Sequence, residues 1–142
     1  MLNEGHPSDE PPLSSALRVL IVDDNTDAAT SLGILLEMNG ATVRVVHDGP
    51  AALDSLEDFG PIVALLDLGM PGMDGCEVAR RIRGHPRFSQ LLLVAQTGWG
   101  NEECRRLTTD AGFDHHLVKP VDLNLLINLL ARNTPGEGAR SA

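Results

Sequence analysis

The feature of this chain that most constrains its fold is an alternation, repeated five times, of short apolar runs with longer segments of helical character. Residues 19–22, 62–66 and 91–95 are continuously apolar, as expected of strands that are covered on both faces. Residues 42–46 alternate more and residues 115–118 form a shorter run, which indicates edge strands. The chain is therefore predicted to contain three central strands and two edge strands.

Residues typical of helix ends separate these runs. Each run is followed by residues that favour a helix start: Asn25 or Thr26, Pro50, Asp74, Asn101 and Asp122. Glycines that can stop a helix follow three of the segments, at Gly40, Gly84 and Gly112. Each strand is thus expected to lead into one helix.

Such an alternation, with right-handed crossovers, forms a parallel sheet with helices on both faces. Five units fit an α/β, doubly wound, flavodoxin-like fold whose five-stranded parallel sheet has the order 2-1-3-4-5. The folded domain is expected over residues 17–132. Residues 1–16 are rich in proline, serine and acidic residues and are expected to form a flexible N-terminal arm, and residues 133–142 a flexible C-terminal tail.

Charge and composition exclude several classes of protein. The 142 residues include 11 Lys and Arg against 20 Asp and Glu, a net charge of −9, which is the wrong balance for a nucleic-acid binder and favours a cation or a basic partner surface. No apolar run is long enough to span a membrane, and no secretory signal is visible. Cys76 and Cys104 form no CxxC pair, so a reducing, cytoplasmic setting is expected.

Polar residues follow four of the predicted strands at the point where each strand ends. Asp23 and Asp24 follow the first strand, Asp67 the third, Thr97 the fourth, and Lys119, the only lysine, the fifth. Ligands of doubly wound folds bind outside the carboxyl ends of the strands. Three carboxylates, one hydroxyl and one ammonium are therefore expected at one edge of the sheet.

This set of side chains indicates a magnesium and phosphoryl site. A single Asp at a strand end commonly just caps the next helix, but the pair with Asp67 nearby favours a cation site, because crowded carboxylates repel one another. A small oxygen-lined site suits Mg²⁺. The Lys119 ammonium can contact one phosphoryl oxygen as a point charge. The segment containing Thr97 fits either an ordinary glycine-rich turn or a hydroxyl that binds a phosphoryl oxygen.

These motifs, in this order, resemble the receiver domain of two-component response regulators: Asp23-Asp24, the LLDLGMPGMDG segment, Thr97-Gly98 and Lys119-Pro120. The resemblance implies that Asp67 accepts a phosphoryl group from the phosphohistidine of a sensor histidine kinase or a histidine phosphotransfer protein. It also implies that Asp24, Asp67 and the backbone carbonyl of Gly69 bind Mg²⁺, and that Asp23 does so through water. Thr97 and Lys119 would contact the phosphoryl oxygens.

Two positions depart from the family pattern. His116 stands three residues before the lysine, where family members often carry a Tyr or Phe that packs in or out as a switch. It is either a switch residue together with Thr97 or an ordinary edge-strand histidine. Trp99 is bulkier than expected two residues after Thr97.

The resemblance also bears on the partners. The QTGWG and FDHHLVKPVD segments are most similar to receivers attached to, or working beside, hybrid histidine kinases, so the chain is expected to be stand-alone or excised from such a kinase. In the last helix, one leucine face is expected to pack on the sheet, whereas Leu125 and Leu129 are expected to point away from it. These two are either scattered exposed leucines or a docking stripe for a downstream effector or a second receiver.

Two other functions fit parts of the pattern. A Mg²⁺-dependent phosphohydrolase with an aspartyl-phosphate intermediate would want a second Asp two residues after Asp67, where Gly69 stands. A flavodoxin-like binding module would leave the acids, Thr97 and Lys119 without a shared purpose. A signalling receiver, limited to self-phosphotransfer and slow autodephosphorylation, is therefore expected, with protein partners and neither nucleic acid nor membrane.

Overall fold

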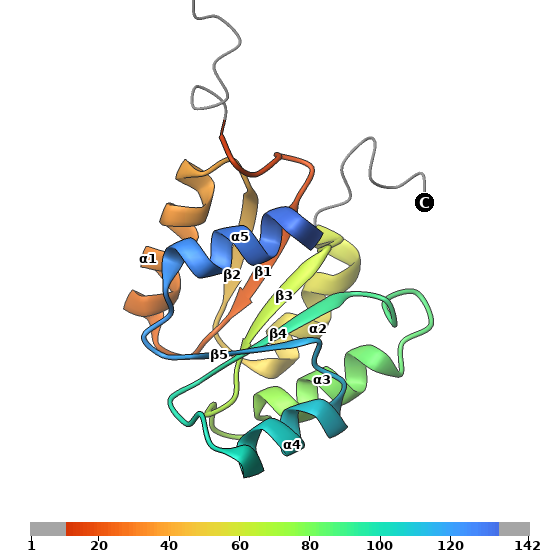
Figure 1. Ribbon diagram of the computed structural model, residues 1–142. Helices are drawn as coiled ribbons and strands as arrows, with labels where there is room; N and C mark the ends of the chain where they lie inside the picture. The colour runs from red at the N-terminus through yellow and green to blue at the C-terminus, as the bar shows by residue number, and fades with distance from the viewer. Residues whose placement is uncertain (1–10, 134–142) are drawn as a thin grey trace, which may run out of the picture.

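The computed structural model describes residues 11–133, in which strands and helices alternate (Figure 1). The strands are β1 (Arg18–Val22), β2 (Thr42–Val46), β3 (Val63–Asp67), β4 (Leu92–Thr97) and β5 (His115–Val118). The helices are α1 (Thr26–Met38), α2 (Gly49–Phe59), α3 (Gly75–Arg83), α4 (Glu102–Ala111) and α5 (Leu123–Asn133).

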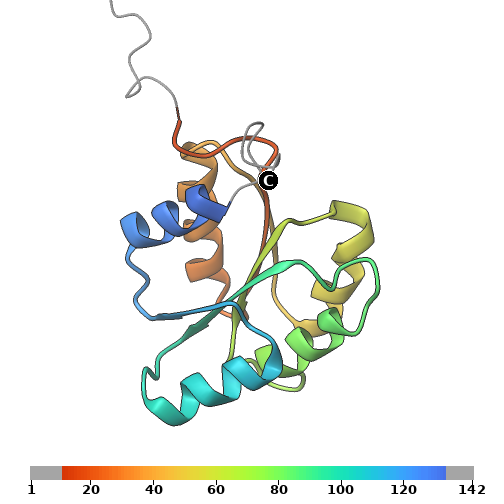
Figure 2. The ribbon, with the colours of Figure 1, turned by 45° about the vertical axis from the view of Figure 1, so that its right-hand side comes forward.

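The strands form one parallel sheet in the order β2-β1-β3-β4-β5, so the predicted doubly wound α/β fold is confirmed. Strands β2 and β5 are the edges, as their weaker apolar character predicted. Helices α1 and α5 cover one face of the sheet, and α2, α3 and α4 cover the other (Figures 1 and 2).

The two faces have separate apolar cores because successive strand residues point to opposite sides. Val19, Ile21 and Leu65 belong to the cluster shared with α1 and α5. Leu20 and Leu66 belong to the cluster shared with α2, α3 and α4. Burial on both faces explains why the central strands read as continuous apolar runs.

Side-chain caps set the helix starts. Asn25, Asp74 and Asn101 each accept a hydrogen bond from a backbone N–H of the first turn, as predicted. The second helix begins at Gly49, one residue before the predicted Pro50, because Asp48 caps it through the backbone N–H of Ala51 at 2.8 Å.

The predicted start of the folded region at Leu17 is too late. Residues 1–10 of the expected arm and residues 134–142 of the expected tail lie outside the described residues. Leu13, however, is only 3% exposed and belongs to the α1–α5 core. Its N–H donates to the carbonyl of Asn39 at 2.9 Å, and Thr42 Oγ1 donates to the carbonyl of Ser15 at 2.7 Å. One leucine in a polar segment thus anchors residues that composition alone marked as flexible.

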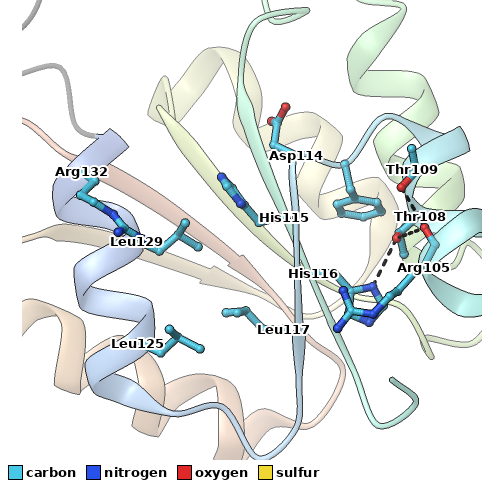
Figure 3. Close-up of a pocket in the computed structure, with 11 residues that line it drawn as sticks. Arg105, Thr108, Thr109, Asp114, His115, His116, Leu117, Leu125, Leu129 and Arg132 are labelled. Atoms are coloured by element: carbon cyan, nitrogen blue, oxygen red, sulfur yellow. Dashed lines mark hydrogen bonds between the residues drawn. The ribbon is translucent and has the colours of Figure 1, made fainter. Parts of the chain in front are cut away.

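Helix α5 corrects one further expectation. Leu126, Ile127 and Leu130 are buried and Leu125 is 53% exposed, as predicted. Leu129 was expected to point away from the sheet, but it is only 7% exposed. It lies between α5 and the edge strand β5 (Figure 3). Because α5 packs beside this edge strand, the buried face of the helix is wide enough to include Leu129.

Candidate functional site

Five polar side chains lie at the carboxyl ends of four adjacent strands, as the topology requires. Asp23 and Asp24 follow β1, Asp67 ends β3, Thr97 ends β4 and Lys119 follows β5. Because all strands are parallel and adjacent, their carboxyl ends share one edge of the sheet.

Three carboxylates form the acidic part of this edge. One carboxylate oxygen from each of Asp23, Asp24 and Asp67 lies within 4.8 Å of the other two. Asp23 and Asp67 are 3% and 7% exposed, whereas Asp24 is exposed to solvent. Oxygens spaced in this way, open on one side, suit a divalent cation that keeps some of its water.

Lys119 is the cation that the described residues supply to this cluster. Its Nζ lies 3.2 Å from Asp23 Oδ2 and 3.2 Å from Asp67 Oδ1. Burial lowers the pKa of the Lys119 ammonium, but the charges of Asp23 and Asp67 and their hydrogen bonds outweigh it, so the pKa is raised. The ammonium therefore stays charged between two carboxylates.

The charged form of Asp23 is disfavoured in the folded protein. Burial raises its pKa, and the nearby charge of Asp67 adds to this, against the opposing effects of the Asn25 N–H and of Lys119. Its Oδ1 accepts from the Asn25 N–H at 2.9 Å, and its backbone carbonyl lies 3.0 Å from His47 Nδ1. Burial, more than the neighbouring carboxylate, is therefore what disfavours the charged form of Asp23.

The backbone around Asp67 is held by contacts that the sequence did not reveal. The Gly69 N–H donates to Asp67 Oδ1 at 3.3 Å. A Cβ at Gly75 would lie 2.6 Å from the backbone oxygen of Asp67, so only glycine fits where α3 starts. One sign of this contact was visible in the sequence, because a glycine stands in the first turn of a predicted helix, where better helix formers are usual.

Thr97 shares a cavity of about 280 Å³ with Asp67 and Gly69. Its Oγ1 accepts from the Trp99 N–H at 3.1 Å, which leaves its own hydroxyl proton free to be donated. Cys104 Sγ lies 3.9 Å from this hydroxyl, and Cys76 lines the same cavity. Burial, followed by the charge of Asp74, raises the pKa of the Cys76 thiol. Neither cysteine had been expected at this site.

His116 lies away from the carboxylates and links β5 to α4. Its Nε2 is 3.3 Å from the Trp99 carbonyl oxygen, and its Nδ1 is 3.3 Å from Thr108 Oγ1 (Figure 3). It also lines a cavity of about 400 Å³ between α4, β5 and α5, together with Arg105, His115 and Arg132 (Figure 3). The residue thus contacts the loop that follows Thr97.

None of the helices in residues 11–133 combines the length and apolar character that a membrane crossing needs.

Sequence comparison places these residues among known proteins. A family model of the response regulator receiver domain matches residues 19–131. An uncharacterised 14.6 kDa protein from Leptolyngbya boryana is 38% identical over 112 residues, which cover 79% of this chain and 86% of that protein. The response regulator MprA of Mycobacterium tuberculosis is 36% identical over 130 residues, 89% of this chain but only 56% of MprA. The chain thus spans little more than half the length of that regulator.

Solved structures agree with this placement. The signal receiver domain of a DNA-binding response regulator from Colwellia psychrerythraea has a TM-score of 0.78 at 26% identity, and the alignment covers 84% of this chain and 99% of that one. The chemotaxis protein CheY4 of Vibrio cholerae has a TM-score of 0.78 at 26% identity, over 82% and 97% of the two chains. The receiver domain of a histidine kinase from Syntrophus aciditrophicus has a TM-score of 0.74 at 25% identity, over 82% and 91%.

Proposed function

Because the chain belongs to the response regulator receiver domain family of two-component signalling, we propose that Asp67 is its phosphoacceptor. The donor would be the phosphohistidine of a sensor histidine kinase or of a histidine phosphotransfer protein. An Asp67 carboxylate oxygen forms the new P–O bond, while the P–N bond breaks and its electron pair returns to the imidazole of the donor.

The observation that carries this proposal is the position of Lys119. Its ammonium is 3.2 Å from Asp67 Oδ1, so it already lies beside the oxygen atoms where a phosphoryl group would attach. A carboxylate is a poor acceptor of a negatively charged group unless charge is neutralised there. Lys119 supplies that neutralisation as a compact point charge, and Thr97 adds a hydroxyl proton for a second phosphoryl oxygen.

The acidic cluster fits a bound Mg²⁺. Three carboxylate oxygens lie within 4.8 Å of one another, and one lysine is a small counter-charge for them. Asp24, Asp67 and the Gly69 carbonyl would hold the ion directly and Asp23 through water. When bound, Mg²⁺ would neutralise charge on the phosphoryl oxygens.

Thr97 and His116 would form the switch. A phosphoryl group on Asp67 would attract the Thr97 hydroxyl, whose oxygen at present accepts a hydrogen bond from the Trp99 N–H. The carbonyl of Trp99 is bound to His116, and His116 also contacts Thr108 of α4. Movement of Thr97 would therefore reach the surface between α4, β5 and α5 through His116.

The output is proposed to be a protein contact in the cytoplasm, with a downstream effector or a second receiver as the reader. The net charge of −9 disfavours nucleic acid as a partner. The domain would act as a signalling element, limited to self-phosphotransfer and slow autodephosphorylation. The family match favours this function over a phosphohydrolase or a flavodoxin-like binding module.

Labelling with acetyl phosphate tests the proposal. Wild-type protein should gain one phosphoryl group by intact mass in Mg²⁺ and none in EDTA. Asp67→Asn should gain none. Asp74→Asn is the matched control, because it removes an acid near the same edge while Asn still caps α3. Equal labelling of Asp67→Asn and wild type would contradict the assignment.

A further inference from the structure

Gln96 has a buried amide group that its surroundings do not satisfy. It is the fifth residue of β4 and is only 3% exposed. Its Nε2 is buried and has no hydrogen-bond partner among the described residues. Buried polar groups nearly always have a partner, so an unsatisfied donor of this kind calls for an explanation.

Gln96 also lines a cavity of about 510 Å³, between α1 and the segment that joins β5 to α5. Most of the cavity wall is apolar. Leu32 and Leu35 come from α1, and Pro120 and Val121 come from the β5–α5 segment. A cavity of this size with an apolar wall and few polar groups has the character of a small-molecule site.

Most of the lining of this cavity, apart from one charged pair, is apolar. A buried water needs two to four polar partners. Asp23 and Lys119 form the charged part of the wall, an ion pair at 3.2 Å. The remaining wall offers the hydroxyl of Ser31 and apolar side chains. An apolar molecule with one acceptor oxygen matches both the mainly apolar wall and the donor amide of Gln96.

We propose that this cavity binds a small, mainly apolar molecule whose carbonyl oxygen accepts a hydrogen bond from Gln96 Nε2. The last torsion of a Gln side chain is soft, so a rotation can turn Nε2 toward the cavity. The site is separate from the cavity that Asp67 shares with Thr97, and the proposal does not depend on phosphotransfer. Because Asp23 and Lys119 form part of the wall, an occupant would lie against this ion pair.

The probe for the test is 4-phenyl-2-butanone, with butylbenzene as the probe that lacks the acceptor. In ¹H–¹⁵N spectra of the full chain, the ketone should shift the Gln96 side-chain NH₂ signals and saturate. Butylbenzene should bind about tenfold more weakly, the usual value of one hydrogen bond. Gln96→Leu should abolish this preference, because it removes the donor and leaves the rest of the cavity wall unchanged.

Two further variants locate the binding. Ala28 is exposed and lines the cavity, so Ala28→Phe should fill it and block the ketone. Thr30→Phe adds the same ring at an exposed position of the same helix, outside the cavity lining, and should bind like wild type. The proposal is overturned if no saturable Gln96 shift occurs, if both probes bind equally to wild type, if Ala28→Phe binds normally, or if a bound water on the amide survives the ketone.

Discussion

The charged groups near the two ends of the β-sheet differ in how completely they are satisfied. Near the amino ends of β4 and β5, the Arg83 guanidinium donates to three backbone carbonyl oxygens and pairs with Asp114 at 2.8 Å. Asp114 Oδ2 in turn accepts from the Leu93 N–H at 2.9 Å. At the carboxyl ends, the single ammonium of Lys119 is shared by two members of a three-carboxylate cluster.

The difference separates a structural contact from the proposed functional site. The planar fork of arginine matches several fixed acceptors and fastens α3 to the sheet. The carboxylate cluster instead has three carboxylates and one ammonium, and the proposed cation and phosphoryl group would bind there.

The largest expected effect is on stability. Arg83→Ala should lower the free energy of unfolding by about 3 kcal/mol, because three part-buried backbone carbonyl oxygens and the Asp114 carboxylate lose their donor. Urea unfolding measures this. Arg81→Ala is the control, since its pair with Glu77 is exposed, and it should change stability by less than about 0.5 kcal/mol. Equal losses of stability in the two variants would show that the Arg83 contacts stabilise the fold no more than an exposed ion pair does.

Lys119→Ala should act on chemistry. Loss of the ammonium should slow labelling of Asp67 by acetyl phosphate by about tenfold to hundredfold, because one group that neutralises phosphoryl charge is gone. Some labelling of Asp67 should remain, but phosphorylation should no longer change the proposed protein contact. The rate of mass increase measures the effect, and Arg132→Ala, a distant cation, should label at the wild-type rate. An unchanged rate in Lys119→Ala would contradict its role.

Asp67→Asn should have the opposite effect on stability from Arg83→Ala. In EDTA it should raise the free energy of unfolding by about 1 kcal/mol, since one of three crowded charges is removed. Asp74→Asn, which keeps its helix cap, serves as the control in the same urea experiment and should show no gain. A loss of stability in Asp67→Asn would mean that the cluster is fully compensated after all.

The smallest effect is a pH dependence at Asp23. Its pKa in the folded protein is raised above the ordinary value of 3.8, so its charge destabilises the fold at neutral pH. Asp23→Asn should therefore be more stable than wild type at pH 7. In metal-free urea titrations this difference should shrink as pH falls through the raised pKa toward 3.8, because the folded wild type takes up its proton first. If the stability difference between Asp23→Asn and wild type grew on acidification, the charged form of Asp23 would stabilise the fold, contrary to this prediction.

Much of this arrangement was predictable because it follows from periodicity and topology. Asp23, Asp67 and Lys119 end apolar runs, and a parallel sheet necessarily brings such ends together. Leu13 and Leu129 were assigned wrongly because their burial depends on how α1, α5 and the edge strands pack, which local pattern does not encode.

The contacts of Arg83, Gly75 and Gln96 were missed for a related reason. Arg83 reads as one of several arginines in an amphipathic helix, and only the fold brings Asp114 to it. Gly75 is required by a backbone atom of Asp67, and Gln96 is notable only because the fold leaves its amide without a partner. For Arg83 and Gly75 the deciding contact joins segments that are separate in sequence, and for Gln96 the fold places the amide where no partner reaches it.

Chemical mapping of the phosphoryl group tests the central claim most directly. Borohydride reduces an acyl phosphate to an alcohol, so phosphorylated Asp becomes homoserine, which peptide mass spectrometry can locate. After reaction with acetyl phosphate and Mg²⁺, the account predicts homoserine at position 67 and unmodified Asp23 and Asp24. Homoserine at position 23 or 24, or at no acidic residue of the cluster, would contradict it.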